Sequence, residues 1–374
     1  MVAEAWSNPT GGAGRGDWSL IGADLVAEAP ASLFRGPAAG SVYAHVRGLM
    51  HHRRDGAFSD YVGSFHPVSN TFASEQLRVY NLYYRHAPAQ AGWQIKVGQL
   101  ALDDDFAVSA GGSHFLNAAF GALPTLTGTP VPTDRGGGAA FPIYSVAAPG
   151  VWFSRELGGD AGWQAGLYHG GPGSDRRGNH GFRWDSLSRS GLVAVTELAL
   201  EHRVGSRAAT TRVGASLHTG TFEDAEALAM GSPDAKVRRL WSVYATHDFT
   251  LVPSDDPAAP RLLGFGRVGL APQSDRAAVS HYADFGLVSH GLVPARPQDV
   301  AGAGVSYSHF GRGFRRVNGL GQTETVAEVF YAVAATARLT ITADLQWVFN
   351  ATRDAAVGDR GTAAVVGLRT RFAW

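Results

Sequence analysis

The 374-residue sequence contains no cysteine, so thiolate catalysis, thiolate metal sites and disulfide bonds are all excluded. It also lacks any run of about 18 consecutive apolar residues, the length that a membrane-spanning helix requires. Charge of one sign is not in excess, because 32 basic residues balance 32 acidic ones. This balance argues against nucleic acid as a partner. Contact with lipid must therefore come from strands, since only helices and closed barrels satisfy every backbone group in hydrocarbon.

Three further features are missing from the chain. There is no secretory signal, because Met1 leads directly into VAEAWSNPTGG without a basic or an apolar segment. We expect that the sequence starts late, either as a mature form or from a misplaced start, rather than that the protein stays in the cytosol. No repeat of about 40–50 residues, as in a β-propeller, is present. No interdomain linker is visible, so we expect a single domain over residues 1–374.

What the sequence does contain is a regular alternation of apolar and polar residues, clearest near the C-terminus. Over 339–350 the odd positions are apolar and the even positions are mostly polar. The pattern returns with Val366 and Leu368 on one parity and Arg369 and Arg371 on the other. Successive side chains leave a strand on opposite faces, so a period of two predicts β-strands. In a membrane barrel the apolar face contacts lipid and the polar face lines a wet lumen.

The same alternation, bounded by turn residues, recurs through the whole chain. The 48 glycines and the 9 Trp, 11 Tyr and 19 Phe residues suit tight turns and aromatic girdles. We predict an all-β fold, a transmembrane antiparallel β-barrel of sixteen strands, the even number that single-chain bacterial barrels require. The predicted strands are 2–7, 18–28, 41–52, 77–86, 93–103, 145–157, 161–170, 191–203, 208–219, 237–251, 261–271, 278–292, 299–310, 323–335, 339–350 and 362–374. The tryptophans expected in an interfacial belt are Trp6, Trp93, Trp163, Trp241, Trp347 and Trp374.

The predicted connections alternate in length. Short ones such as 158–160 and 335–338 separate long ones such as 171–190 and 104–144. This layout is typical of outer-membrane barrels, with short periplasmic turns and long extracellular loops. A segment as long as 104–144 is usually functional or disordered. We expect it to fold into the lumen as a constriction, and an extracellular cap is the alternative.

The inward parity of these strands carries both signs of charge together with amides. Such a mixed lining suits polar, mostly neutral solutes better than a ring of one sign, which favours ions. Aromatic faces would attract such a solute by weak stacking, and exchangeable hydrogen bonds would replace its hydration without trapping it. The candidate pore and substrate-binding residues are Asn81, Arg85, Lys96, Asp103, Asp105, His114, Phe115, Asn117, Phe120, Trp152, Glu197, Glu201, Glu328, Asp344, Gln346, Arg369 and Arg371.

Other chemistry was weighed at two places. The three aspartates at 103–105 would suit a hard cation with oxygen ligands, and a solvated strand end or lumen lining is the alternative. Asn179, His180, Ser186 and Ser188 would form a hydrolase site only if a nucleophile lay within about 3 Å of its base. A Gly- and Arg-rich loop offers no strand to hold them so. We therefore expect no catalytic residue, no metal and no cofactor.

Eight segments stand in a characteristic order and spacing. They are NPTGG at 8–12, RVYNLYYRH at 78–86, VGQLALDDDF at 97–106, HFLNAAFG at 114–121, FPIYSVAAPGVWF at 141–153, ARPQDVAGAGVSYSHF at 295–310, ETVAEVFYAVAATARLTITADLQWVFN at 324–350 and VVGLRTRFAW at 365–374. Together they resemble the carbohydrate-selective outer-membrane porins of the OprB family. Departures from that family's pattern are the missing signal, Trp374 in place of a terminal Phe, and a short first strand.

The resemblance implies a sixteen-stranded barrel in the bacterial outer membrane and passive diffusion of sugars such as glucose through a narrowed lumen. The implied partners are sugar solutes, outer-membrane lipid and the barrel-assembly machinery, which would act on the C-terminal strand ending at Trp374. The assembly would be a monomer or a homotrimer. Two alternatives share part of the argument: a general, weakly ion-selective porin, and a soluble β-rich glycan-binding protein. Sugar-dependent liposome swelling and detergent-free solubility, respectively, would separate them from a sugar porin.

Overall fold

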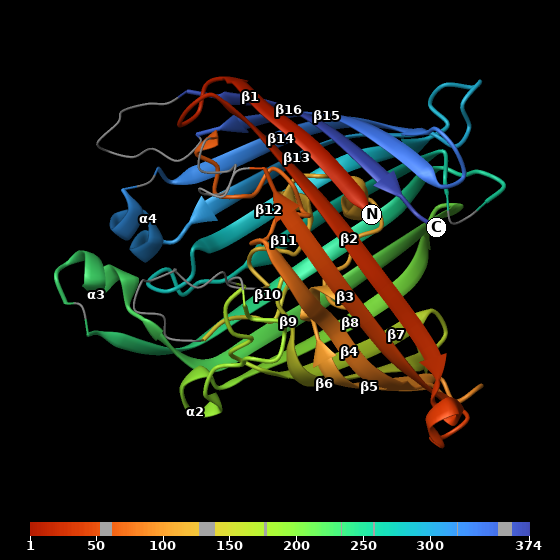
Figure 1. Ribbon diagram of the computed structural model, residues 1–374, viewed down its shortest axis with the longest axis horizontal. Helices are drawn as coiled ribbons and strands as arrows, with labels where there is room; N and C mark the ends of the chain where they lie inside the picture. The colour runs from red at the N-terminus through yellow and green to blue at the C-terminus, as the bar shows by residue number, and fades with distance from the viewer. Residues whose placement is uncertain are drawn as a thin grey trace.

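The computed structural model describes residues 1–52, 62–126, 139–175, 178–232, 234–256, 259–319, 321–350 and 361–374. These residues form a closed barrel of sixteen antiparallel strands (Figure 1). Every strand pairs with its neighbours in sequence, and the first strand closes the barrel against the last. The strands are β1 (Val2–Thr10), β2 (Gly16–Pro30), β3 (Gly40–His51), β4 (Gln76–His86), β5 (Trp93–Leu100), β6 (Ala148–Gly158), β7 (Ala161–His169), β8 (Leu192–Val204), β9 (Arg207–Glu223), β10 (Lys236–Val252), β11 (Leu262–Leu270), β12 (Val279–His290), β13 (Val300–Phe310), β14 (Thr323–Ala334), β15 (Leu339–Phe349) and β16 (Ala363–Phe372).

Short helical segments lie in the connections between strands. They are η1 (Ala31–Phe34), η2 (Leu102–Asp104), η3 (Gly112–His114), η4 (Ala118–Phe120), α2 (Leu187–Ser190), α3 (Ala225–Ala229) and α4 (Arg312–Asn318). In Figure 1 the three α-helices lie at one end of the barrel, the loop end, and the two chain termini lie toward the other, the turn end. Across the described ranges, no helix is both long and apolar enough to cross a membrane.

The sixteen predicted strands are all present, and two of their ends differ in an informative way. β1 extends to Thr10, beyond the predicted range 2–7, and pairs with β16 through most of its length. β5 stops at Leu100 rather than continuing to Asp103. The chain leaves the wall there because residues 102–104 form η2 and turn inward.

Exposure alternates along the strands as the predicted parity requires. On β15, Leu345, Trp347 and Phe349 are 37–43% exposed on the outside, whereas Asp344 and Gln346 are 1% exposed on the inside. The apolar parity therefore forms the outer surface of the barrel, where lipid would lie.

Aromatic side chains gather on the outer surface near both rims. At the turn end, Phe153 lies between Trp93 and Trp163, with ring centroids 6.2 and 5.9 Å away. Nearer the loop end, Trp241 and Trp347 are exposed on the outer face. This arrangement matches the aromatic girdles that flank the apolar band of outer-membrane barrels.

Trp6 does not belong to this belt, and its predicted position is wrong. It is 2% exposed, points inward, and donates a hydrogen bond from Nε1 to Glu4 (2.8 Å). The inward face of β1 carries apolar Val2 and Trp6 beside polar Glu4, because residues 62–73 cover the inner side of the wall there and provide apolar neighbours. The cluster that they form with the wall includes Val2, Trp6, Trp18, Leu20, Leu49, Val62, Val68 and Ala73.

Two connections fold into the barrel and pack against the inner face of its wall. One is the β3–β4 segment, described over 62–75. The other is the β5–β6 segment, described over 101–126 and 139–147. Their buried apolar residues pack against inward-facing wall residues such as Tyr168, Tyr244 and Phe310. Part of the predicted 104–144 loop, residues 127–138, lies outside the described residues.

Candidate functional site

Carboxylates on the inner wall hold both inner segments in place. Glu328 accepts hydrogen bonds from the backbone N–H groups of Leu116 and Asn117, at 2.6 and 2.9 Å. Glu324, on the same face of β14, accepts two backbone N–H groups of the β3–β4 segment, at 2.7 and 3.2 Å. A buried backbone N–H that loses its acceptor costs free energy, so each of these bonds favours the observed position of the segment. These side chains therefore act as fixed anchors for the segments.

The same device recurs on β8 and β10. Glu197 accepts a hydrogen bond from the backbone N–H of Ala107 at 2.8 Å. Asp248 accepts one from the backbone N–H of Gly111 at 3.0 Å and one from the hydroxyl of Ser109 at 2.7 Å. The start of the β5–β6 segment is therefore fixed to β8 and β10, whereas Glu328 fixes a later part of it to β14.

A buried arginine that is not among the predicted site residues completes the anchoring. Arg267 is buried and forms an ion pair with Asp284, with Nη2 2.5 Å from Oδ2. Its Nη1 and Nη2 donate to the carbonyls of Gly121 and Ala119, at 2.7 and 3.3 Å. The sequence does contain a signal for this ion pair. Arg267 and Asp284 carry opposite charges at inward positions of two neighbouring predicted strands, and the register of β11 and β12 places them opposite each other.

Several predicted pore residues lie at the contact between the β5–β6 segment and the wall. Asn117 donates from Nδ2 to Oε1 of Gln346 (2.8 Å), and Gln346 donates from Nε2 to Asp344 (2.8 Å) and to the carbonyl of Val68 (2.9 Å). Asn117, Gln346 and Asp344 are all buried, as are Glu197 and Glu328. The structure therefore places them between wall and segment.

Phe115 and Phe120 also join the segment to the wall. Their rings stack at 4.4 Å between centroids, and Phe115 lies 5.4 Å from Phe265 and 5.2 Å from Phe330. Phe115 is fully buried in this cluster, while Phe120 also borders a cavity. The two rings hold η3 and η4 against the barrel.

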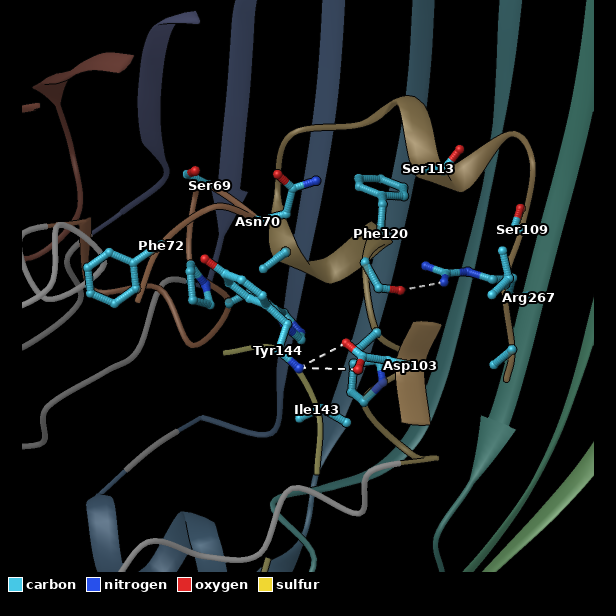
Figure 2. A pocket seen from close by; sticks show the side chains of 18 of the residues that line it. Ser69, Asn70, Phe72, Asp103, Ser109, Ser113, Phe120, Ile143, Tyr144 and Arg267 are labelled. Carbon is cyan, nitrogen blue, oxygen red and sulfur yellow. Dashed lines mark hydrogen bonds between the residues drawn. The ribbon is translucent and has the colours of Figure 1, made fainter. Parts of the chain in front are cut away.

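Cavities that share lining residues lie inside the barrel, and three of them are bordered by residues that the structure describes. The first, about 560 Å³, opens at the turn end beside the two termini. The second, about 540 Å³, lies against β3, β4 and β5, and the third, about 490 Å³, lies between the inner segments (Figure 2). Arg47 borders the first and second, Asn70 the first and third, and Asp103 and Tyr144 the second and third. These four residues mark the place where the cavities meet.

The second cavity combines aromatic faces with paired charges. Tyr43 and Tyr83 stack at 4.8 Å between centroids. Lys96 lies over the rings of Trp152 (4.4 Å) and Tyr83 (5.4 Å), and its Nζ is 2.6 Å from Oδ1 of Asp105. The ammonium is thus held by both a carboxylate and two π faces.

Arg47 and Tyr144 lie at the junction. The Arg47 guanidinium lies 4.8 Å from the centroid of the Tyr144 ring and pairs with Asp24 at 2.6 Å. The ring of His45 also contacts Asp24, at 2.8 Å. Opposite charges are therefore paired along this side of the lumen.

The three aspartates at 103–105 have separate partners. Asp103 accepts from the backbone N–H of Tyr144 (3.1 and 3.2 Å), as Figure 2 shows, and Asp104 accepts from Nδ2 of Asn81 (2.7 Å). Burial, and then the charge of the adjacent Asp104, raise the pKa of Asp103 to about 7. Among the described residues, no group of three or more His, Asp or Glu side chains is placed to hold a metal ion.

Arg369 and Arg371 lie toward the turn end. Arg369 donates from Nε to Glu4 (2.6 Å) and from Nη2 to Oδ1 of Asn70 (2.8 Å), so it ties the β3–β4 segment to β16. Both arginines line the first cavity.

The remaining predicted pore residues lie away from the junction. Arg85 forms an exposed ion pair with Glu28 (2.8 Å) at the turn end. Glu201 is exposed near the same end of β8. His114, in η3, faces the ring of His290 at 5.5 Å.

The residues weighed as a hydrolase site make structural contacts instead. The ring Nδ1 of His180 is 2.7 Å from the Leu77 carbonyl, and the hydroxyls of Ser186 and Ser188 are hydrogen-bonded to each other at 2.8 Å. Asn179 donates to backbone carbonyls of its own loop. None of these contacts joins His180 to a serine.

Comparison with known proteins gives one family and several similar structures. Residues 45–374 match the carbohydrate-selective porins of the OprB family. The high-pH structure of Pseudomonas putida OprB has a TM-score of 0.84 at 17% identity, over 100% of this chain and 92% of that one. The low-pH structure of that protein has a TM-score of 0.57 at 14% identity, over 100% and 90%. The outer membrane channel DcaP of Acinetobacter baumannii has a TM-score of 0.55 at 12% identity, over 100% and 95%.

No curated protein sequence matches the chain. At these identities the structural likeness shows the fold, whereas the family match extends over most of the sequence. The chain therefore belongs to the OprB family of carbohydrate-selective porins, channels of the bacterial outer membrane.

Proposed function

We propose that neutral sugars of the size and polarity of glucose, and short oligosaccharides of them, pass through the second cavity. Their passage is passive and is narrowest where Arg47, Asp103 and Tyr144 meet. The observation that carries this proposal is the lining of that cavity, in which stacked tyrosines stand beside paired charges.

The chemistry of a sugar ring explains why this lining suits it. Its C–H face is apolar and stacks weakly on aromatic rings such as Tyr43 and Tyr83, while its hydroxyls exchange hydrogen bonds with Lys96 and Asp105. Because each charge already has a partner, no single group holds the solute tightly. Conduction requires binding that is favourable enough for entry and weak enough for exit.

Most of the predicted site residues fall into two groups under this proposal. Those that border the first or second cavity are assigned to the sugar path: Asn81, Lys96, Asp103, Asp105, Arg369 and Arg371. Those that are buried at the contact between the β5–β6 segment and the wall are assigned to holding the segment: Phe115, Asn117, Glu197, Glu328, Asp344 and Gln346. Trp152, beneath Lys96, supports the cavity wall.

Replacement of Lys96 by Met tests the assignment. The substitution keeps an unbranched chain but removes the charge that holds Asp105 and stands over Tyr83. We expect glucose-driven swelling of proteoliposomes to fall by about threefold to tenfold, since the net contribution of one hydrogen bond is about 0.5–1.5 kcal/mol. Glu201→Gln, at an exposed position outside the cavities, is the matched control.

The same experiment separates a sugar porin from a general porin. If Lys96→Met changes conductance in salt while glucose swelling stays at the wild-type rate, the cavity conducts ions without selecting sugars. Detergent-free solubility of refolded protein would instead support a soluble glycan-binding protein. The exposed apolar outer face, including Ile21, Leu198 and Phe285, favours the membrane.

The exposed apolar outer face also indicates which partners surround the barrel. We propose that outer-membrane lipid covers the apolar band, with the turn end in the periplasm. The barrel-assembly machinery would recognise β16, whose end continues to the exposed Trp374. Solution mass of the purified barrel in detergent would decide between a monomer and a homotrimer.

A further inference from the structure

Within the described ranges, no strand pairs with the loop half of β4 on the side that faces β5. β3 pairs with β4 from Gln76 to His86, but β5 pairs only with the part from Leu82 to His86. Backbone groups of residues 76–81 therefore face a gap in the wall. At membrane depth each unpaired N–H or C=O costs several kcal/mol, so the gap must be filled.

Residues 179–184, here called the strap, fill part of this gap from the β7–β8 connection. The backbone N–H of Val79 donates to the carbonyl of His180 (3.0 Å), and the His180 ring Nδ1–H donates to the carbonyl of Leu77 (2.7 Å). From β5, the side chain of Gln99 donates Nε2 to the carbonyls of Val79 (2.7 Å) and Tyr80 (3.0 Å). A loop and one side chain thus replace the missing ladder.

The strap is itself braced and closely fitted. Oδ1 of the buried Asn179 accepts the N–H of Gly181 (3.1 Å), and its Nδ2 donates to the carbonyl of Ser174 (2.8 Å). Gly181 has φ +108°, and a Cβ there would lie 2.2 Å from the Val79 carbonyl oxygen. Its outward side chains, Phe182 and Trp184, are exposed and border an apolar groove on the outer wall, as a lipid-facing element should.

A β-bulge lies directly beneath the strap. His45 pairs with Asn81 and Val46 pairs with Val79, so Tyr80 has no partner on β3. As a result Tyr80 and Asn81, although adjacent, both point inward and border the second cavity. A bulge re-aims a side chain at the expense of the ladder, and here the strap and Gln99 repair that ladder.

Asn81 links the β-bulge to the residues of the β5–β6 segment that border the second cavity. Its Nδ2 donates to Asp104 (2.7 Å), and its Oδ1 accepts the backbone N–H of Ala101 (3.0 Å). These two bonds fix the point where the chain leaves β5 and enters η2. The position of the 103–105 aspartates therefore depends on the bulge, and the bulge depends on Gln99 and the strap.

We propose that the strap serves as a replacement strand for β4, and that Gln99 and His180 are positioning residues for the Asn81–Asp104 contact in the sugar path. The second half of this inference rests on the proposed function of the second cavity. The first half concerns the wall alone and has a readout of its own.

Two glycines of the same loop give a matched pair of variants. Gly181→Ala and Gly178→Ala both place a side chain at positive φ, but only the first meets the Val79 carbonyl, since nothing lies within 4 Å of a Cβ at Gly178. In folded, heat-modifiable barrels we expect the Val79 amide to exchange with solvent about tenfold faster in Gly181→Ala than in Gly178→Ala. Equal exchange would overturn the role of the strap.

Gln99→Leu tests the positioning role without straining the backbone, and it carries the test should Gly181→Ala not fold. We expect it to lower the ratio of glucose flux to salt conductance about threefold, and Gln99→Leu with Asn81→Ala to lower it no further than Asn81→Ala alone. Additive losses in the double variant would overturn the positioning role. So would a wild-type ratio of glucose flux to salt conductance in Gln99→Leu, provided that Asn81→Ala lowers this ratio. A wild-type ratio in Asn81→Ala would instead overturn the proposed sugar path, and amide exchange would still report on the strap.

Discussion

At the scale of the residue, pointing inward and lining a pore are different properties. Glu197, Glu324 and Glu328 all face the barrel axis, yet each accepts at least one backbone N–H from an inner segment. Glu197 also accepts hydrogen bonds from Gln164 and Tyr244 on the wall. A buried charge costs free energy unless it is hydrogen-bonded, and backbone N–H groups supply those bonds here. These three side chains therefore anchor the inner segments and do not line the path of the solute.

Removal of one such anchor should destabilise the barrel. Glu328→Ala leaves the N–H groups of Leu116 and Asn117 buried without an acceptor. Each such group costs roughly 1–3 kcal/mol, so we expect the free energy of unfolding to fall by about 2–5 kcal/mol. The temperature at which the folded band is lost in a heat-modifiability gel would report it. Glu201→Ala, at an exposed site, should lie within about 0.5 kcal/mol of wild type.

A second residue-scale prediction concerns pH. Because burial and Asp104 raise the pKa of Asp103 to about 7, its carboxyl is mostly neutral at pH 5 and mostly ionised at pH 8. Negative charge thus appears at the junction as pH rises, and preference for cations over anions should rise with it. The reversal potential across a salt gradient would measure this change. Asp103→Asn should flatten the change between pH 5 and 8, and an unaltered profile would contradict the assignment.

The inward orientation of these residues could be predicted from the sequence, but their burial against the β5–β6 segment could not. Parity alone places Glu197, Glu328 and Gln346 on the inner face, and the structure finds them there. What decides whether water reaches them is the path of the β5–β6 segment, which follows from contacts between residues far apart in the chain. Leu116 and Glu328, for example, are 212 positions apart. No local pattern encodes such a pairing.

At the scale of the element, strands were predictable because each carries its own signal in its alternation and its flanking turns. The exceptions arise where another element intervenes. β5 ends at Leu100 because η2 turns inward, and β1 presents Trp6 inward because residues 62–73 cover it. Tyr80 is a third case, since its bulge is completed by the strap. Local rules fail at the places where a loop acts as part of the wall or core.

The β5–β6 segment should depend on its aromatic contact with the wall. Phe115→Ala removes a fully buried ring packed against Phe120 and Phe265, and such truncations cost about 3–5 kcal/mol. We expect the segment to detach before the barrel opens, so protease cleavage within 101–126 should become faster while the heat-modifiable band persists. Phe285→Ala removes an exposed ring from the outer face and should leave cleavage unchanged.

At the scale of the whole molecule, closure is the feature that gives each strand two different environments. β1 and β16 pair from Val2 with Arg371 to Thr10 with Ala364, and the Met1 amine donates to the Phe372 carbonyl at 2.8 Å. No strand edge is then left for lipid to meet along this seam. Inside, anchored segments turn a wide cylinder into a set of small cavities, and outside, a continuous apolar band remains.

Two adjacent residues of β2 isolate this difference between inside and outside. Leu25 is 64% exposed on the outer face, whereas Val26 is 51% exposed and borders the first cavity. Both side chains are apolar and exposed, so Leu25→Arg and Val26→Arg differ mainly in whether the new side chain meets lipid or water.

Leu25→Arg should lower the free energy of unfolding by about 2–4 kcal/mol at a position near the bilayer midplane, because it places a guanidinium in hydrocarbon. Val26→Arg should fold as well as wild type and shift conductance toward anions, since its charge meets water. Folding yield in lipid vesicles measures the first effect and single-channel reversal potential the second; equal loss of folding in both variants would mean that Val26 does not face an aqueous lumen.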